Sequence, residues 1–433
     1  PVLLGLKVLL LVRLARCKHL DIPLANRLPV ELDRLLKVLL DSQVHIRLSR
    51  RPSILTLAQD DTARLDACVG EEGLDVLLGR RVGEAPQADD GSGGAVRRAA
   101  AAAAASASLL LVAKVMGKAG SVLTITVPAT TANLACGFDA FGAAFELRMA
   151  LRSSPAPPGS RATRFSYTGE GAAQAPTGED NLIWRSALAC ARMHAPGRDL
   201  PKLLISVHNP VPFGRGLGSS ATAIIAGVML ANEQLGLGLT HGQLLDAALE
   251  MENHPDNLAP ALYGGAVASG VGDDGRSMVR PFGINRQIKA VVLIPEFEVE
   301  TEKARQVLPT AYSRADAVYN VQRVGLLPLA LSSRTLDVRL VRECMKDRLH
   351  QQYRAPLIPG LVECLDLPNT SSNPNLIATA LSGAGPTILS LGTGDLRKIG
   401  SLMSDCMASK GVKSRILVLP FAHTGATARW SMW

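Results

Sequence analysis

Hydrophobic side chains recur with two clear periods along residues 116–433, and these periods predict the regular elements. Alternating or β-branched runs predict strands at residues 121–127, 203–207, 288–294 and, as the last strand of the chain, 414–418. Apolar positions three and four residues apart predict helices at residues 181–194, 221–235, 241–251, 301–309, 316–324, 326–333, 336–349 and 397–410. Because strands and helices come in clusters without strict alternation, the fold class we expect is α+β.

Three shorter features refine this pattern. Residues 143–151 are extended, and the polar stretch 152–176, rich in Pro and Gly, is expected to form a hairpin and a loop. Thr301 is a candidate N-cap for the helix that starts there, since its hydroxyl can accept a bond from a backbone N–H. Residues 382–385 form a turn of small residues ahead of an apolar stretch, which predicts a buried strand.

Residues 1–115 differ in composition from the rest of the chain. They are rich in Leu and Arg, and the runs 87–94 and 99–108 are typical of a linker. Two interpretations stay open: a leader such as a transit peptide, or poorly ordered upstream sequence outside the working protein. Acidic residues at 60–61 and 71–72 argue against a pure transit peptide. We expect a cytoplasmic protein, or a plastid protein if this segment is a transit peptide.

Composition and charge exclude several classes of function. With 433 residues, 47% of them hydrophobic, the chain is long enough for two or three domains. The net charge of +8 comes from basic residues spread along the sequence, so no nucleic-acid-binding surface is expected. The seven cysteines form no CxxC pair, which indicates free thiols and no zinc site. No apolar run has the roughly 18 residues that a membrane-spanning helix needs.

The most informative stretch is residues 210–223, PVPFGRGLGSSATA. Three glycines lead from a predicted strand into a predicted helix that begins with two serines, and glycine lets backbone amides approach a ligand closely. A helix N-terminus offers free N–H groups and the positive end of its dipole, which suits a phosphate. The stretch lacks both the lysine of GxxxxGK[ST] and the spacing of GxGxxG, so an ordinary glycine-rich turn is the alternative.

Two clusters of polar residues interrupt apolar sequence elsewhere. In ENHPDN, the carboxylates of Glu252 and Asp256 are four positions apart, close enough to share a site if the backbone is helical. Carboxylates near a phosphate loop favour Mg²⁺. His254, between them, is by itself more often a structural histidine. Asn133 and Asp139 lie in a loop of small residues, for which an ordinary Asx-rich turn is the simpler explanation.

Six motifs together resemble the GHMP kinases, the family of galacto-, homoserine, mevalonate and phosphomevalonate kinases. GRGLGSSATA is similar to the family's ATP-binding motif, and SGAGPT is similar to its third motif. PATTANLACGFDAFG resembles the first motif as homoserine kinases have it, and EMENHPDNLAPALYGG, TEKARQVLP and YRAPLIPG are also similar to homoserine kinases. Their correct order, from residue 120 to the C-terminus, makes the resemblance far more specific than any single motif.

The resemblance implies a two-domain GHMP kinase fold. An ATP-binding domain like ribosomal protein S5 domain 2 would span residues 116–285, and a ferredoxin-like domain would span 286–433. The implied reaction is ATP-dependent phosphorylation of L-homoserine to O-phospho-L-homoserine, a step of threonine biosynthesis. Magnesium would be the cofactor, and the protein would form a homodimer.

The resemblance also assigns the nucleotide site. Ser220 and Glu252 would be the ligands of Mg²⁺, and Asn181 would help to hold adenine. ATP would lie over the glycine-rich stretch, against Pro212, Phe213, Gly214, Arg215, Gly216, Leu217, Gly218, Ser219, Ser220, Ala221 and Thr222.

The acceptor site follows in the same way. The residues implied to bind homoserine are Asn133, Asp139, His254, Arg305 and Arg354. Homoserine is a zwitterion, whose carboxylate suits the guanidinium groups of Arg305 and Arg354 and whose ammonium group suits Asp139. The residues expected at the reacting centre are Asp139, Asp256, Asn257, Thr301 and Arg305.

The identity of a general base stays open. Asp256 is the obvious carboxylate, but homoserine kinases are usually described as lacking a dedicated aspartate base. Asp256 and Asn257 are therefore expected mainly to organise the site. Two rival functions remain: a kinase for another small alcohol such as mevalonate, or a catalytically inactive homologue with a binding role. Substitutions at 135–136, 253 and 351–352 depart from the usual family residues and affect fine specificity more than the reaction class.

Overall fold

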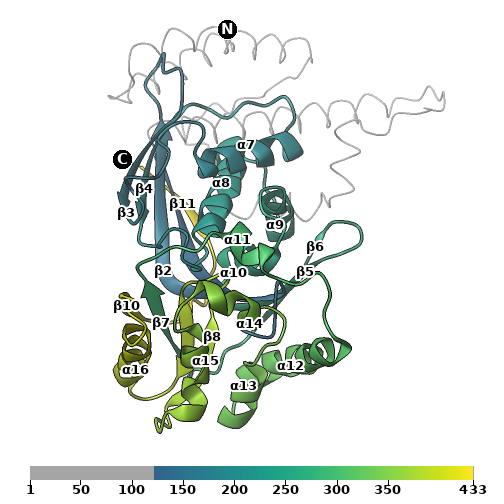
Figure 1. Cartoon of the computed structure of the whole chain (residues 1–433). Coiled ribbons are helices and arrows are strands. Elements are labelled where there is room, and N and C mark those ends of the chain that lie inside the picture. The colour runs from purple at the N-terminus through teal and green to yellow at the C-terminus, as the bar shows by residue number, and fades with distance from the viewer. Residues whose placement is uncertain (1–120, 433) are drawn as a thin grey trace, which may run out of the picture. The chain divides into compact units, whose positions relative to one another are not determined.

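A computed structural model describes residues 121–432, which belong to one compact unit, Gly120–Trp433. The predictions for residues 1–115 lie outside the described residues. Within the described range, two sheets with their helices form two halves, and the predicted α+β class is confirmed (Figure 1). None of the described helices is both long and apolar enough to cross a membrane.

The first half is built on a seven-stranded sheet whose main path runs β11-β1-β2-β4-β3. Strands β5 and β6 extend it from β2, and only β3 and β4 pair in parallel. Its strands are β1 (Ser121–Ala132), β2 (Phe141–Pro155), β3 (Arg164–Gly169), β4 (Leu203–Asn209), β5 (Ala266–Val271), β6 (Ser277–Phe282) and β11 (Thr427–Met432).

Four helices cover one face of this sheet (Figure 1). They are α7 (Leu182–His194), α8 (Ser219–Leu235), α9 (His241–Leu249) and α10 (Pro255–Tyr263). Helix α8 is buried on most sides, as its nearly continuous apolar sequence requires. Its side chains Ile224 and Ile225 share a core with Leu123 and Ile125 of β1 and Trp184 of α7. This packing fixes the N-terminus of α8, and with it the glycine-rich stretch.

The second half is built on an antiparallel sheet of four strands in the order β10-β7-β9-β8. The strands are β7 (Lys289–Pro295), β8 (Leu376–Leu381), β9 (Ile388–Gly392) and β10 (Ser414–Leu419). The helices are α11 (Thr301–Gln306), α12 (Arg314–Ser332), α13 (Val338–Cys344), α14 (Gln351–Arg354), the 3₁₀ helix η1 (Ala355–Leu357), α15 (Leu361–Thr370) and α16 (Leu396–Ala408).

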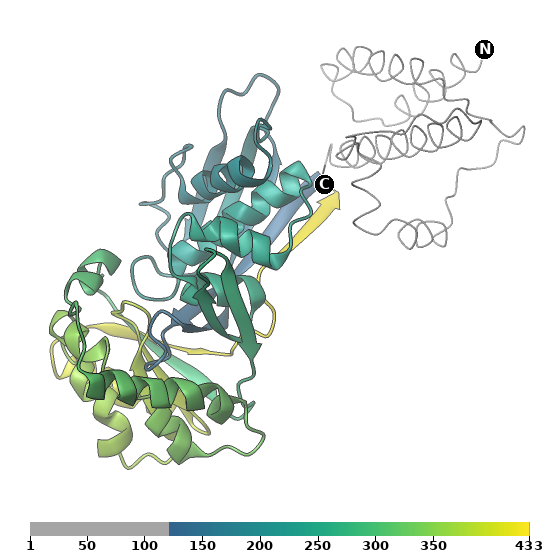
Figure 2. The same cartoon turned by 90° about the vertical axis from the view of Figure 1, so that its right-hand side faces the viewer.

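The last strand returns to the first half. In Figure 2 the yellow β11 lies beside β1, and the two pair antiparallel from Ser121 opposite Met432 to Thr126 opposite Thr427. The prediction that 414–418 is the last strand is therefore wrong. The sequence of β11, TARWSM, has too few apolar residues to predict a strand, and its partner strand supplies the missing stability. A domain boundary at 285/286 stays a prediction, with β11 on the N-terminal side of it in space.

Three other local predictions are wrong. Residues 152–176 form no hairpin, because β3 pairs in parallel with β4 and not with β2. Thr301 is the first residue of α11, and the N-cap is Glu300. The two helices predicted at 316–324 and 326–333 are the single helix α12, which tolerates the exposed Gly325 at a cost of about 1 kcal/mol.

Candidate active site

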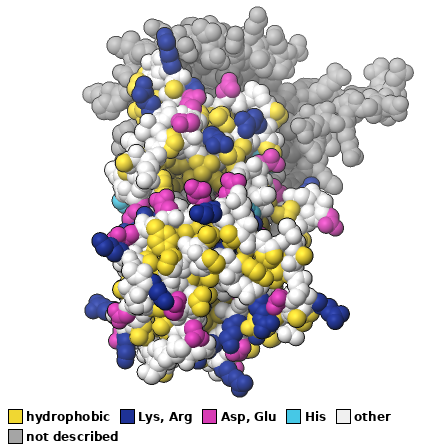
Figure 3. Space-filling view, viewed as in Figure 1, with side chains coloured by type: hydrophobic (Ala, Val, Ile, Leu, Met, Phe, Trp, Pro, Cys, Tyr) yellow, Lys and Arg dark blue, Asp and Glu magenta, His cyan; other side chains and the backbone are white. Residues whose placement is uncertain are grey.

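A cavity of about 170 Å³ lies where the two halves meet. Its walls come from the glycine-rich stretch, the loop after β1, the start of α10, helix α11, Arg354 and the turn after β8. Acidic and basic side chains gather across this middle region of the face in Figure 3. The fold therefore brings together polar and charged side chains from segments that are more than 200 residues apart in the sequence.

The glycine-rich stretch forms a loop that only glycines can follow. Gly216 and Gly218 have φ of 78° and 67°, in the left-handed region. A Cβ at Gly216 would clash with the carbonyl oxygen of Ser382, and one at Gly218 would clash with the hydroxyl of Thr130. Gly218 caps α8 without a side-chain hydrogen bond, so the first N–H groups of the helix have no side-chain cap. The loop thus offers backbone donors to the cavity.

The turn of small residues at 382–385 braces this loop. The hydroxyl of Ser382 donates to the carbonyl of Gly216 and shares a second hydrogen bond with the hydroxyl of Thr131. The amide of Thr387 donates to the carbonyl of Arg215 at 3.2 Å. The glycine-rich motif GRGLGSSATA and the motif SGAGPT are therefore joined by hydrogen bonds.

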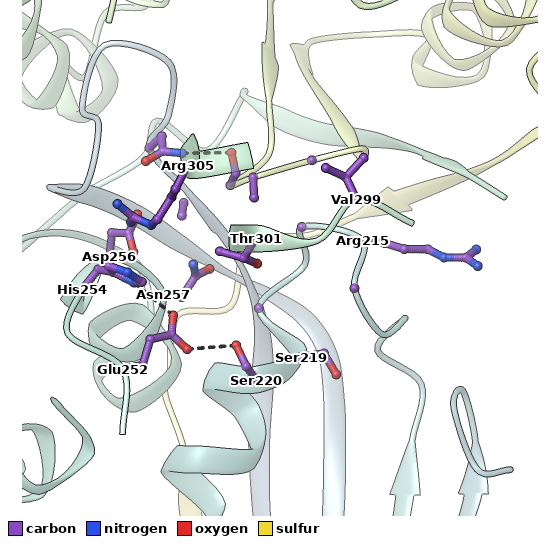
Figure 4. Close-up of a pocket in the computed structure, with 18 of the residues that line it drawn as sticks. Arg215, Ser219, Ser220, Glu252, His254, Asp256, Asn257, Val299, Thr301 and Arg305 are labelled. Carbon is purple, nitrogen blue, oxygen red and sulfur yellow. Dashed lines mark hydrogen bonds and ion pairs between the residues drawn. The ribbon is translucent and has the colours of Figure 1, made fainter. Parts of the chain in front are cut away.

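Ser220 and Glu252 meet at the edge of the cavity. The Ser220 hydroxyl donates to Glu252 Oε2 at 2.9 Å, and Glu252 Oε1 lies 3.3 Å from His254 Nδ1 (Figure 4). This contact with Glu252 raises the pKa of His254 above its ordinary value. Glu252 precedes α10, whose N-cap His254 is extended, so Glu252 and Asp256 share the cavity without sharing a helical turn.

Asp256 is a carboxyl group with little access to water, 3% exposed in the first turn of α10. Burial, with a further contribution from nearby Asp139, raises its pKa to about 7. Its neighbour Asn257 accepts a hydrogen bond from Thr130 Oγ1 at 2.7 Å. Asp256 can therefore gain or lose a proton near neutral pH, and Asn257 ties α10 to β1.

A paired carboxylate and guanidinium face the cavity from opposite halves. Arg305 donates from Nη2 to Asp139 Oδ1 at 2.8 Å and from Nη1 to Oδ2 at 3.2 Å. The amide of Asp139 donates to Asn133 Oδ1 at 3.0 Å, which shapes the loop between β1 and β2. In Figure 4, Arg305 lies above His254 and Asp256.

Arg354 is a second guanidinium, 2% exposed, at the end of α14. Its Nε donates to the carbonyl of Ala304 at 3.1 Å, and its Nη1 donates to the carbonyl of Gly383 at 2.9 Å. Both arginines lie over the ring of Phe138, with the guanidinium carbons 5.9 Å and 5.4 Å from the ring centre. The guanidinium groups of Arg305 and Arg354 thus line the same cavity as the carboxyl groups of Asp139, Glu252 and Asp256.

A second, largely apolar cavity of about 270 Å³ lies on the other side of the glycine-rich loop. Phe213, Gly214, Ser219 and Ser220 line it together with Tyr167 and Asn181. The Asn181 side chain donates to Tyr167 Oη and to the carbonyl of Pro176. Its Oδ1 accepts a hydrogen bond from the backbone amide of Ile183, which makes Asn181 the N-cap of α7. Asn181 therefore builds the wall of this cavity with its polar atoms already engaged.

All five predicted acceptor-binding residues line the first cavity, as do Thr301, Asp256, Asn257, Ser220 and Glu252. Four predicted nucleotide-binding residues line neither cavity: Pro212, Leu217, Ala221 and Thr222 are buried behind the loop. The side chain of Arg215 points away in Figure 4 and donates to the carbonyl of Pro295 at 3.2 Å. These five residues shape the loop from behind or beside it.

Several residues of the site escaped the sequence analysis. Phe138 lies inside the first motif, and Gly383 and Gly385 lie inside the third. The motifs were identified from the sequence, but the contact of Phe138 with Arg354 and the place of the two glycines in the cavity wall were not predicted. Thr130 also lies inside the first motif, and His350 lies outside all six motifs. Their partners are 127 and 215 residues away along the chain, and only the fold brings them close.

Comparison with known proteins agrees with this geometry. The family described as "GHMP kinases N terminal domain" matches residues 181–265. The homoserine kinase of Schizosaccharomyces pombe is 38% identical over 333 residues, which are 71% of this chain and 98% of the relative. That of Solibacter usitatus is 40% identical over 274 residues, 63% of this chain and 86% of the relative.

A crystal structure of homoserine kinase from Cytophaga hutchinsonii superposes with a TM-score of 0.62 at 28% identity, over 71% of this chain and 97% of that one. A crystal structure of mevalonate kinase has a TM-score of 0.50 at 12% identity, covers 69% of this chain and 99% of the other, and supports the fold alone. The chain belongs to the GHMP kinase family and, within it, to the homoserine kinases.

Proposed function

We propose that this protein transfers the γ-phosphoryl group of ATP to the hydroxyl of L-homoserine and releases O-phospho-L-homoserine and ADP. The observation that carries the proposal is the arrangement of Asp139, Arg305 and Arg354 around one cavity beside the glycine-rich loop. Homoserine bears an ammonium group, a carboxylate and a hydroxyl. A carboxylate and two guanidinium groups complement its two charges.

The ion pair between Asp139 and Arg305 supports this assignment. The two side chains are each about one-third exposed and neutralise each other at 2.8 Å. A zwitterion can replace this ion pair with two others. Its ammonium group would pair with Asp139, and its carboxylate would pair with Arg305 and Arg354. Mevalonate has a carboxylate but no ammonium group, so it would leave Asp139 without a cationic partner.

ATP would place its phosphates over the N-terminus of α8 and its adenine in the apolar cavity beside Asn181. Phosphoryl transfer needs little covalent help from protein side chains, and positioning and charge stabilisation do most of the work. The backbone donors of the loop meet the phosphates. The acceptor residues aim the homoserine hydroxyl, with Thr301 at the cavity wall between them.

Ser220 and Glu252 would hold Mg²⁺. Their oxygens are hard donors, they already meet at 2.9 Å, and they lie beside the loop that would bind the phosphates. Residues 121–432 contain no group of three or more His, Cys, Asp or Glu side chains suited to a metal, so phosphate oxygens and water would complete the coordination. When bound, the ion would neutralise charge on the phosphates. A homodimer and a cytoplasmic location remain predictions from the sequence.

A coupled assay of ADP release tests the proposal. The full chain is offered ATP and Mg²⁺ with L-homoserine, mevalonate or galactose, each over the same concentration range. We expect turnover with homoserine and none above background with the other two. Turnover with mevalonate or galactose but not with homoserine would overturn the assignment. No turnover with any acceptor, while ATP still binds, would favour an inactive homologue.

A further inference from the structure

His350 is a fully buried histidine next to the acceptor site, at the N-cap of α14. Its Nε2 lies 2.8 Å from the carbonyl oxygen of Ala135, in the loop between β1 and β2. Its Nδ1 lies 3.3 Å from Nη1 of Arg354. One imidazole ring thus bridges the loop that carries Asn133 and Asp139 to the arginine on the far wall of the cavity.

The chemistry of these two partners determines where the ring proton lies. A guanidinium N–H can only donate, so Nδ1 of His350 must accept. A carbonyl oxygen can only accept, so Nε2 must carry the proton and donate. Burial, which is the largest effect, lowers the pKa of His350 and keeps the ring neutral.

The charged groups around the ring act in both directions: Arg354 lowers the pKa of His350, Asp347 and Asp139 raise it, and with burial the net pKa is lowered. Arg354 and Asp139 face it from the cavity, and Asp347 Oδ2 lies 3.7 Å from Nε2. Asp347 accepts bonds from the backbone amides of His350 and Gln351 at 3.0 and 2.8 Å through that same oxygen, so this oxygen is already engaged at the start of α14. The proton on Nε2 therefore stays directed at Ala135.

Each end of this bridge holds an element that needs support. Asn133, Leu134 and Ala135 have φ of 73°, 42° and 61°, a left-handed backbone that is strained for residues with a Cβ. The ring of His350 also stacks on Phe138 with the ring centres 5.1 Å apart. The bond from Nε2 and this stacking hold the loop in its left-handed course.

At the other end, the bridge orients a guanidinium. Nη1 of Arg354 donates to Gly383 and His350, and Nε donates to Ala304. Within the part of the chain that the structure describes, Nη2 makes no hydrogen bond, and Arg354 lines the cavity. Three protein acceptors thus fix the plane of the guanidinium and leave its remaining donors for a ligand.

We propose that His350 is a positioning residue that sets the separation between Arg354 and the loop of Asn133 and Asp139. It would hold the sites for a carboxylate and an ammonium group at the spacing of an α-amino acid. The inference rests on the proposed function, since it assigns a specificity role for the same acceptor. Its consequence is selectivity for a zwitterionic amino alcohol over alcohols that carry only one of the two charges.

Two amide variants of the full chain separate the two ends of the bridge. In His350→Gln the side-chain amide can reach the position of Nε2 and donate to Ala135, but the acceptor for Arg354 is lost. In His350→Asn the amide can reach the position of Nδ1 and accept from Arg354, but the bond to Ala135 is lost. Because a hydrogen bond to a charged group contributes about 1.5–3 kcal/mol, we expect His350→Gln to raise the KM for homoserine about tenfold or more.

The KM for ATP separates positioning from general damage to the fold. We expect it to stay within about twofold of wild type in His350→Gln, and we expect His350→Asn to keep a homoserine KM closer to wild type than His350→Gln does. A purely structural histidine would lower the melting temperature in both variants without a selective change in the homoserine KM. That result, or equal increases in both KM values, would overturn the proposal.

A nitrogen-15 NMR spectrum of histidine-labelled wild type tests the proposal even if the variants fail to fold. At neutral pH we expect one buried ring with a protonated Nε2 and a bare Nδ1, assigned by its loss in either variant or by its contact with Phe138. A proton on Nδ1, or on both nitrogens, would overturn the bridge. If the wild type phosphorylates another alcohol in place of homoserine, the proposed function and this inference are overturned together. If the wild type phosphorylates homoserine normally and His350→Gln has an unaltered KM for homoserine, the inference alone is overturned.

Discussion

The two sides of the cavity are built in opposite ways. The proposed nucleotide side is one continuous stretch, in which Gly216 and Gly218 have left-handed backbones and Arg215 is the one charged residue of residues 210–223. The acceptor side is assembled from Asp139, Arg305 and Arg354, which come from three separate segments and act through their charges. Under the proposed function, backbone geometry would recognise the phosphates common to all ATP-dependent kinases, and side chains from distant segments would recognise what is particular to the acceptor.

The largest effect is expected on the nucleotide side, from Gly218→Ala. The new Cβ would clash with Thr130 Oγ1 and force a left-handed residue at the cap of α8. We expect kcat/KM for ATP to fall by about 1,000-fold or more, because the amides that would meet the phosphates move. Initial rates over a range of ATP concentrations measure this change.

Gly236→Ala is the matched control. Gly236 also has a left-handed φ, of 63°, at the other end of α8, but its Cβ would meet nothing within 4 Å. Both variants therefore carry a backbone strain of about 1 kcal/mol, and only Gly218→Ala adds the clash with Thr130. Equal losses of activity in the two variants would mean that strain, rather than the shape of the loop, limits nucleotide binding.

Arg354→Ala should affect the acceptor side alone. Arg354 is a buried guanidinium that would face the substrate carboxylate under the proposed function. Its removal should cost about two charge-assisted hydrogen bonds, which corresponds to roughly a 100-fold higher KM for homoserine. The KM for ATP should stay within about threefold. Arg276→Ala, at an exposed side chain, controls for a general loss of positive charge. Comparable increases in both KM values would contradict the division between the two sides.

Glu252→Gln tests the point where the two sides meet. The amide keeps the size of the side chain and can still bond Ser220, but it lacks the charge that favours Mg²⁺. We expect kcat to fall about 10- to 100-fold and the Mg²⁺ concentration for half-maximal activity to rise. Glu298→Gln, at a half-exposed carboxylate paired with Arg215, is the control. An unchanged dependence on Mg²⁺ would remove Glu252 from the proposed metal site.

The smallest effect is a dependence of stability on pH. Asp256 is fully buried, and its pKa is raised from the ordinary value to about 7, so the folded state binds a proton there that the unfolded state releases. Stability from this group is present at low pH and is lost as pH rises through about 7. Relative to wild type, Asp256→Asn should therefore gain stability between pH 5 and pH 8, by about 1.4 kcal/mol for each effective pKa unit. Urea unfolding at both pH values measures it, and a constant difference would contradict the raised pKa.

The sequence predicted the two sides of the cavity through different kinds of signal, for a physical reason. A strand, a glycine loop and an apolar helix are local patterns, and each was found within a few residues of its predicted position. The acceptor residues emerged only through motifs, because nothing local in Arg354 or Asp139 says which side chains they will face. His350, which acts through a contact 215 residues away along the chain, left no pattern to detect.

The same reasoning explains the local errors. The N-cap of α11 shifted by one residue, to Glu300, because helix starts depend on the chain that leads into them. Strand β11 exists because β1 offers it a partner, and its own sequence is only weakly strand-like. That Asn181 helps to hold adenine stays a prediction: it lines the apolar cavity, and its amide is engaged with Tyr167 and Pro176.

The most direct test of the central claim is acceptor selectivity measured with one charge removed at a time. The full chain is assayed for ADP release with L-homoserine, with 4-hydroxybutanoate, which lacks the ammonium group, and with 3-aminopropan-1-ol, which lacks the carboxylate. The account predicts that either loss lowers kcat/KM by about 100-fold or more, because Asp139 or the two arginines lose their partner. Turnover of either analogue as efficient as that of homoserine would contradict it.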